Sequence, residues 1–170
     1  MPTIPVQVSA AEAEEIVCAR LPVAGPVKAR LLHHPYSGLV YRVEQSALGR
    51  RLTLHVHTMV DLCSGAAAVC TPWPELMENP GAESIQGPSP VLTSAAAEDQ
   101  ARQCVVRTLL HRRFSLRHPR IELVQQCSVM GKPNWLVTIE GNRHFGVLVD
   151  GLSGIYHTVP LPRPAADRAS

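Results

Sequence analysis

The sequence contains "VLVDGLSGIYHTVP" at Val147–Pro160 and, upstream, "TMVDLCSGAAAVCTP" at Thr58–Pro72. Both stretches carry the pattern Val-Asp-x-x-Ser-Gly between one apolar segment and a second, shorter one. Such a pattern is typical of two β-strands joined by a tight turn. Because it occurs twice, it indicates that a structural unit has been duplicated.

The two aspartates of this pattern are predicted to be turn residues. Each stands where a strand ends, so its carboxylate can accept hydrogen bonds from the backbone N–H groups of the turn. Gly65 and Gly154 follow Asp61 and Asp150 in the two copies and supply positive φ at little steric cost. We therefore interpret the repeated pattern as a duplicated structural turn rather than as a pair of catalytic carboxylates.

A helix is expected to open each copy. "VSAAEAEEIVCARL" (Val8–Leu21) has apolar residues at helical spacing, with Ser9 as N-cap and Glu12 placed to complete a capping box. "TSAAAEDQARQCVVRTLLHRRF" (Thr93–Phe114) has the same periodicity over a longer stretch. Each half of the chain therefore begins with an amphipathic helix.

Extended segments are expected after each helix. The first begins at Pro26 in one half and at Pro119 in the other, and its apolar residues alternate. A loop comes next, "HPYSG" or "SVMGKPN". The β-branched and aromatic segments Leu39–Glu44 and Trp135–Glu140 follow and align with each other residue for residue. Each half then continues into the strand, turn and short strand quoted above.

The expected fold class is α+β, with two α-β-β-β(-β) repeats, each an antiparallel sheet with one helix packed across it. The segment between the repeats is rich in Pro, Gly and Ser, and prolines are frequent in the C-terminal tail. The expected divisions are a first repeat at 1–76, a linker at 77–92, a second repeat at 93–160 and a flexible tail at 161–170.

The order of these motifs resembles the PepSY domain. That family has a helix with an "S-x-x-E-A" pattern, a "Y-x-V" strand and a closing "V-D-x-x-T-G-x-V" hairpin. The matching segments are "VSAAEAEEIV", "VYRVE" and "MVDLCSGAAAV" in the first half, and "AAAEDQARQCVV", "WLVTIE" and "VLVDGLSGIYHTV" in the second. Ser64 and Ser153 stand where the family usually has threonine. The resemblance implies a small sheet crossed by one helix, no catalytic residues, and a role in binding or inhibiting peptidases.

Composition narrows the class of protein. Of the 170 residues 45% are apolar, which is enough for a globular core. The formal net charge is +2, so overall charge demands neither a nucleic acid nor an anionic membrane as partner. No apolar run approaches the roughly 20 residues of a membrane-spanning helix. The N-terminus lacks a signal-peptide pattern and the five cysteines lack CxxC spacing, so we expect reduced thiols and a cytoplasmic location.

The most distinctive surface feature is the basic segment Arg107–Arg120. Cations at the C-terminal end of a helix complement its dipole, and residues 86–170 carry a basic excess whereas residues 1–85 carry an acidic one. We expect this segment to meet a protein or peptide partner of acidic character. Nucleic-acid binding, by phosphate contacts and base stacking, is the less favoured alternative. The expected contact residues are Arg107, Arg112, Arg113, Phe114, Arg117 and Arg120.

Histidine and cysteine offer other chemistry. His55 and His57 lie two residues apart in an expected strand and so project to the same side, with Cys63 and Cys70 nearby in sequence. This is half of a zinc site, because a structural site needs four ligands, and the second copy has no histidines at the equivalent places. We therefore predict no metal. A metal- or thiol-dependent enzyme that uses these four residues is kept as a further alternative.

The expected function is a non-enzymatic protein- or peptide-binding scaffold without a cofactor. An open sheet edge presents unpaired backbone groups, so strand addition is a natural mode of binding for such a module. Homo-oligomerisation is compatible with this function and with both alternatives.

Overall fold

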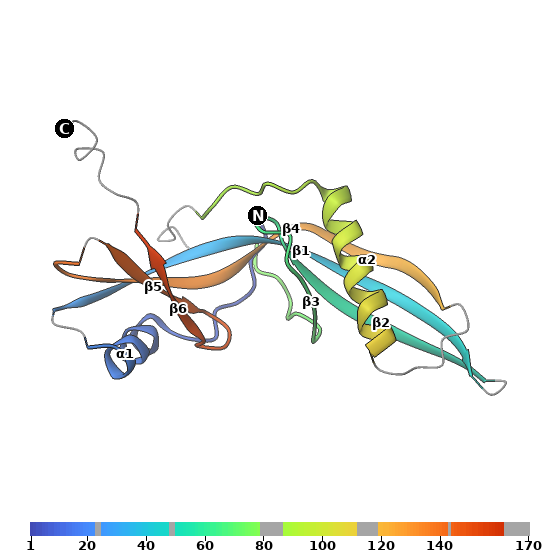
Figure 1. The fold of residues 1–170 in the computed structure, drawn as a ribbon, viewed down its shortest axis with the longest axis horizontal. Coiled ribbons are helices and arrows are strands. Elements are labelled where there is room, and N and C mark those ends of the chain that lie inside the picture. Colours follow the sequence, from blue (N-terminus) through green and yellow to red (C-terminus); the bar gives the residue numbers. More distant parts are fainter. Residues whose placement is uncertain (23–24, 48–49, 79–86, 112–118, 143, 162–170) are drawn as a thin grey trace. The chain divides into compact units, whose positions relative to one another are not determined.

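The computed structural model describes residues 1–170 except 23–24, 48–49, 79–86, 112–118, 143 and 162–170. The predicted α+β class is confirmed, because the described residues form two helices and six strands (Figure 1). In chain order these are α1 (Ala10–Arg20), β1 (Val27–Ala47), β2 (Arg50–Asp61), β3 (Ala67–Cys70), α2 (Ser94–His111), β4 (Arg120–Ile139), β5 (Phe145–Asp150) and β6 (Tyr156–Pro160).

Helix α1 begins at the predicted cap. The backbone N–H of Glu12 donates to Ser9 Oγ at 3.3 Å, and the backbone N–H of Ser9 donates to the Glu12 carboxylate at 2.7 Å. Two N–H groups that the first helical turn leaves without a helical partner are satisfied in this way. The predicted capping box is therefore confirmed.

The six strands form one antiparallel sheet in the order β3-β2-β1-β4-β5-β6. The expectation of a separate sheet for each repeat is wrong. The segments predicted as loops, 34–38 and 128–134, are extended and lie within β1 and β4, which are 21 and 20 residues long. Their backbone groups find partners without a chain reversal: Ser37 pairs with Val60 of β2, and Gly131 C=O accepts the Ile4 N–H at 2.9 Å.

Contacts divide the chain into two units. Unit 1 comprises Met1–Ile4, His34–Glu78 and Pro88–Gly131, and unit 2 comprises Pro5–His33, Asn79–Gly87 and Lys132–Ser170. The chain passes from unit 2 to unit 1 inside β1 and returns inside β4. Each unit therefore takes a helix and the strand after it from one half of the sequence, and its other three strands from the other half.

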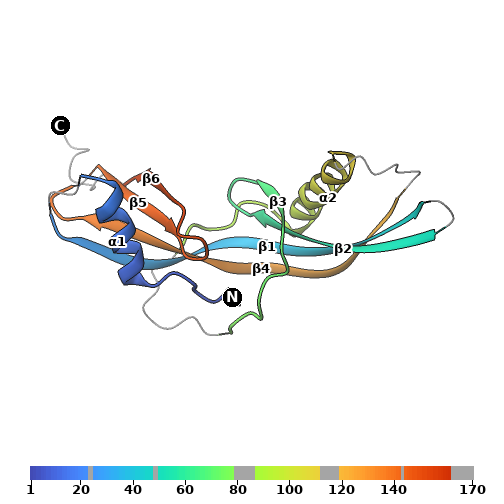
Figure 2. The same cartoon turned by 90° about the horizontal axis from the view of Figure 1, so that it is seen from below.

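In unit 1, α2 packs on one side of β1, β2 and β4 (Figure 2). Tyr41 is fully buried beneath the helix and its hydroxyl donates to the Glu98 carbonyl at 3.1 Å. A buried hydroxyl needs such a partner, since an unpaired one is costly. The buried core consists of Leu39, Tyr41, Val43, Val60, Leu62, Ala97, Ala101, Val105 and Leu109.

In unit 2, α1 packs on β4 and β5. Its buried face is small, being formed by Ala13 and Val17, and partly buried apolar residues surround it. The Trp135 indole N–H donates to the Val8 carbonyl at 2.6 Å and so anchors the segment that leads into the helix. The buried core consists of Ala13, Val17, Val137, Val147 and Val149.

The two helices are thus exchanged between the halves of the sequence. Helix α1 packs on Val147 and Val149 of the second half, whereas α2 packs on Leu39 and Val60 of the first. In domain swapping, copies of a fold exchange an identical element through a hinge. Here the chain crosses between the two units in the extended segments inside β1 and β4.

Strand register fixes which residues of the two halves are equivalent. Tyr36 of β1 pairs with Asp61, the last residue of β2. Asn134 of β4 pairs with Asp150, the last residue of β5. Because the two aspartates hold the same place in the repeated turn, Tyr36 corresponds to Asn134.

This equivalence corrects the predicted alignment of the second strands. Leu39 corresponds to Val137 and not, as predicted, to Trp135, which is two residues earlier. A shift of two residues keeps every side chain on the same face of a strand. The alternating hydrophobic pattern therefore fits either alignment, and only the pairing decides between them.

Candidate functional site

Asp61 organises the turn after β2. Its Oδ1 accepts the N–H groups of Cys63 at 2.8 Å and Ser64 at 3.3 Å, and its Oδ2 accepts the Ser64 hydroxyl at 2.7 Å. Gly65 follows with a φ of 77°. His34 Nε2 lies 2.9 Å from Oδ1. Burial raises the pKa of Asp61, but its hydrogen bonds, that with His34 foremost, outweigh burial and lower the pKa below the ordinary value.

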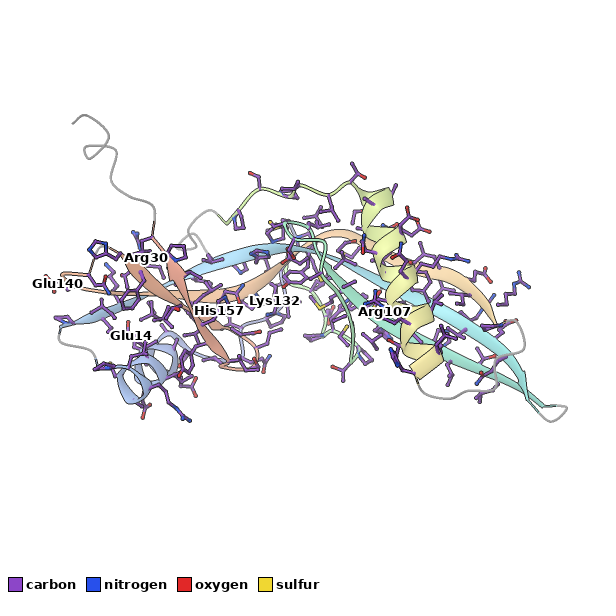
Figure 3. All side chains as sticks on the ribbon, viewed as in Figure 1. Glu14, Arg30, Arg107, Lys132, Glu140 and His157 are labelled. Carbon is purple, nitrogen blue, oxygen red and sulfur yellow. The ribbon has the colours of Figure 1, made fainter. Side chains whose placement is uncertain are left out.

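Asp150 organises the equivalent turn after β5. Its Oδ1 accepts the N–H groups of Leu152 at 2.8 Å and Ser153 at 3.4 Å, and Gly154 has a φ of 72°. The ammonium of Lys132, labelled in Figure 3, donates to Oδ2. Burial raises the pKa of Asp150, but the bonds from Lys132 and the turn backbone outweigh burial and lower it. Both aspartates therefore bind their own turn and one side chain from a neighbouring strand.

A groove lies between α2 and β2 in unit 1. It encloses about 150 Å³ and is mostly apolar. The residues that line it are Leu54, His55, Val56, His57, Val69, Cys70, Val105, Thr108 and Leu109. Every one of them belongs to unit 1, so the groove is a feature of that unit alone.

The groove exists because β3 is shorter than β2. Strand β3 ends at Cys70, which pairs with His57. Continuing the register would place Pro72 opposite His55, and proline has no N–H to donate to a neighbouring strand. In the described part of the chain, no strand lies beside β2 before His57 on this edge.

Three of the four metal- or thiol-site candidates, His55, His57 and Cys70, border this groove, whereas Cys63 lies in the Asp61 turn. Leu54 and Val56 pack toward α2, so the alternation along β2 directs the side chains of His55 and His57 to the opposite face of the sheet. The three candidates therefore do not converge inside the groove. The His57 ring meets Trp73 edge to face, with centroids 5.3 Å apart, and its Nδ1 is buried without a hydrogen-bond partner among the described residues. Burial raises the pKa of Cys70 to about 11, so its thiol is protonated near neutrality.

The basic segment is described at its two ends only. Arg107 is exposed on α2 (Figure 3), and Arg120 begins β4 with a side chain that is 73% exposed and lies 3.9 Å from Glu122. The other expected contact residues lie outside the described residues; they are Arg112, Arg113, Phe114 and Arg117. Whether the six meet on one surface stays a prediction.

The outer face of α2 carries an exposed apolar strip. Val106 and Leu110 are four residues apart, hence neighbours on the helix surface, and are 39% and 65% exposed. Arg102 and Arg107 flank them and line the same shallow depression. This face combines apolar contact area with positive charge.

Comparison of the chain with protein-family models, with curated proteins and with solved structures finds no match. The resemblance to the PepSY domain therefore rests on the quoted motifs alone. Among the described residues, neither helix is long and apolar enough to cross a membrane.

Two features of unit 1 were missed by the sequence reasoning. The first is the location at β2 of the open sheet edge expected for strand addition, which the unequal lengths of the two strands and Pro72 would have indicated. The second is the contact between His34 and Asp61, residues 27 apart in sequence. That contact depends on strand register, for which the sequence held no signal.

Proposed function

We propose that this protein is a non-enzymatic module that binds an extended peptide by strand addition to the open edge of β2. The observation that carries the proposal is the groove beside that edge, where an apolar floor lies next to backbone groups that no strand in the described part of the chain pairs with. An added strand would use both, since main-chain hydrogen bonds supply affinity and side-chain pockets supply specificity. The resemblance to a family linked to peptidase binding agrees with this class of function.

The alternation of hydrogen-bonding directions along β2 identifies which residues point their backbone N–H and C=O groups toward the open edge. The Asp61 N–H donates to the Ala66 carbonyl at 2.9 Å, so this pair is a hydrogen-bonded one. In an antiparallel ladder every second residue faces the same neighbour. By that alternation His57 faces β3, and the next two residues with the same orientation are His55 and Thr53. Among the described residues no strand pairs with their N–H and C=O groups, which an incoming strand could therefore use.

The floor of the groove defines the side chain it would take. Leu54 and Val56 of β2 and Val105 and Leu109 of α2 supply apolar walls, and Thr108 is a half-buried lining residue. A cavity of about 150 Å³ holds a benzene-sized apolar group. We therefore expect a peptide in extended conformation with one aromatic or branched apolar side chain facing α2.

A peptide-display selection on the wild-type protein supplies the probe for a test. The affinity of one selected synthetic peptide is then measured for His55→Pro, which removes an N–H of the open edge, and for Thr108→Trp, which fills the groove. Each change is expected to weaken binding by at least about tenfold, the equivalent of one good hydrogen bond or more. His55→Ala and Thr108→Ser are the matched controls and are expected to bind normally.

Backbone amide shifts of the labelled protein locate the peptide independently of these variants. Changes centred on 53–57 and on 105–109 would support strand addition. Equal affinity of the selected peptide for wild-type protein and for both disruptive variants would show that it binds elsewhere, and the proposal would then be wrong.

The exposed strip on α2 favours a second candidate function, the binding of an acidic amphipathic segment of a partner protein. Val106 and Leu110 offer apolar area, and Arg102 and Arg107 offer charge that an acidic segment complements. Helical peptides selected on the protein should then carry acidic and leucine residues, and should lose binding to the double variant Arg107→Glu, Leu110→Asp. Peptides without an acidic bias would count against this candidate.

A further inference from the structure

We propose that His34, Asp61 and Cys63 form a binding site for a zinc-class divalent cation in unit 1. One ligand atom from each residue, an imidazole nitrogen, a carboxylate oxygen and a thiol sulfur, lies within 4.8 Å of the others. No other group of this kind is found in the described part of the chain. The site is separate from the peptide groove and goes beyond the proposed function.

The fold holds the three donors in place. Asp61 ends β2 and is fixed by the N–H groups of its own turn, while Cys63 is fixed because its N–H donates to Asp61 Oδ1 at 2.8 Å. His34 projects from β1 and brings Nε2 to 2.9 Å from the same oxygen. The side chains of His34 and Asp61 are 21% and 17% exposed, so a cation would be partly shielded and still reachable from solvent.

Unit 2 provides an internal comparison. By register, Lys132 corresponds to His34, Asp150 to Asp61 and Leu152 to Cys63. The carboxylate in unit 2 is paired with an ammonium, and the leucine offers no ligand atom. Where unit 2 has the ammonium of Lys132 and an apolar leucine, unit 1 therefore has two residues that can bind a metal ion, His34 and Cys63. This is the difference expected if a bound metal ion supplies the positive charge in unit 1.

The donor set selects the kind of ion. Thiolate and imidazole ligands suit Zn²⁺ and Co²⁺, whereas Mg²⁺ and Ca²⁺ prefer oxygen ligands. Binding would replace the His34–Asp61 hydrogen bond with bonds to the metal, and Cys63 would lose its thiol proton to solvent. Three protein ligands leave the fourth tetrahedral position for water or for a donor from a partner.

Cobalt titration tests the site, because a thiolate ligand gives Co²⁺ a charge-transfer absorption. This absorption disappears when Zn²⁺ displaces the Co²⁺. The intact chain of 170 residues is expected to bind one equivalent of Co²⁺ with this absorption. Cys63→Ser should abolish the absorption, and His34→Gln should weaken binding by at least about 100-fold, as loss of a direct ligand should exceed loss of an outer-shell partner. Neither change removes a hydrogen bond between Asp61 and the residues of its own turn, so both variants are expected to fold. Circular dichroism checks this.

The matched control is the double variant His55→Gln, Cys70→Ser, which removes two of the other three histidine and cysteine candidates and should titrate like the wild type. Wild-type-like absorption in Cys63→Ser, loss of absorption in the control, or no stoichiometric absorption at all would each overturn the proposal. In a second measurement, Zn²⁺ should raise the melting temperature of the wild type and leave that of Cys63→Ser unchanged. An equal rise in both would mean adventitious binding.

Discussion

Pro35 and Pro133 accept the same backbone hydrogen bond in the two units, from the Leu62 N–H at 3.0 Å and from the Gly151 N–H at 3.0 Å. The match continues one step further. Residues that lead into α2 donate to the Leu62 carbonyl at 2.9 Å, and residues that lead into α1 donate to the Gly151 carbonyl at 2.9 Å. The two units therefore repeat one set of contacts, with each helix docked on the turn of the other half of the sequence.

Helix exchange predicts how the separated halves behave. Fragments 1–78 and 87–170 each contain a helix whose buried face finds its partner strands in the other fragment. Neither fragment alone should give a cooperative monomeric fold, because its apolar helix face has no sheet to cover it. An equimolar mixture should regain the circular dichroism and the elution volume of the intact chain. A fragment that unfolds cooperatively as a monomer would show that the halves close on themselves and that exchange is not required.

The Asp150 carboxylate predicts an acid-dependent loss of stability. Its pKa is lowered in the folded protein, so its contribution is present above the ordinary aspartate pKa of about 3.9 and is lost as pH falls through the lower, folded value. Asp150→Asn should lower the free energy of unfolding at pH 7 by about 1–3 kcal/mol, because bonds from Lys132 and the turn lose a charged acceptor. Urea unfolding between pH 2 and pH 7 measures this.

The same series should show the difference between wild type and Asp150→Asn shrinking below about pH 4, as the wild-type carboxylate becomes neutral. Asp99→Asn, a change at an exposed position of α2, is the control and should leave the profile unchanged. A constant difference at every pH would mean that the charge of Asp150 contributes nothing to stability.

Gly151 is predicted to tolerate no side chain. An added Cβ would lie 2.7 Å from the Pro133 carbonyl oxygen, which is backbone and cannot turn aside. Gly151→Ala should therefore destabilise the protein by about 1–3 kcal/mol, the usual cost of overpacking. Ser153→Ala, an exposed change in the same turn, should cost less than about 0.5 kcal/mol. Equal melting temperatures for the two variants would contradict the close approach of Gly151 to the Pro133 backbone.

Local chemistry explains what the sequence could predict. The α1 capping box, the helix of each half, the short last strands and the α+β class follow from interactions between residues close together in the chain. The Ser9–Glu12 contacts span three residues, and alternating apolar residues mark half-buried strands whichever strand lies beside them. These features were therefore predictable from periodicity and spacing.

The exchange and the candidate sites depend on which strands become neighbours. The segments around Pro35 and Pro133 contain the residues expected of loops, yet both are extended because distant parts of the chain supply their backbone partners. Pro35 and Pro133 each accept an N–H from a turn, and Gly131 bonds to the N-terminal segment. Pairing also sets the contact between His34 and Asp61 and leaves the edge of β2 open. Long-range register of this kind has no local signal when a two-residue shift preserves the hydrophobic face.

Cys70 is predicted to be an inert thiol. Burial raises its pKa from the ordinary value of 9.0 to about 11, so the reactive thiolate is scarcer at pH 7 by a factor of about 100. Iodoacetamide at pH 7, followed by peptide mass spectrometry, should label the exposed Cys18 at least about 100-fold faster than Cys70. In urea the two rates should converge, because unfolding removes the burial that separates them. Fast labelling of Cys70 in the folded protein would contradict a half-buried, protonated thiol and would favour the thiol-dependent enzyme over the peptide-binding module.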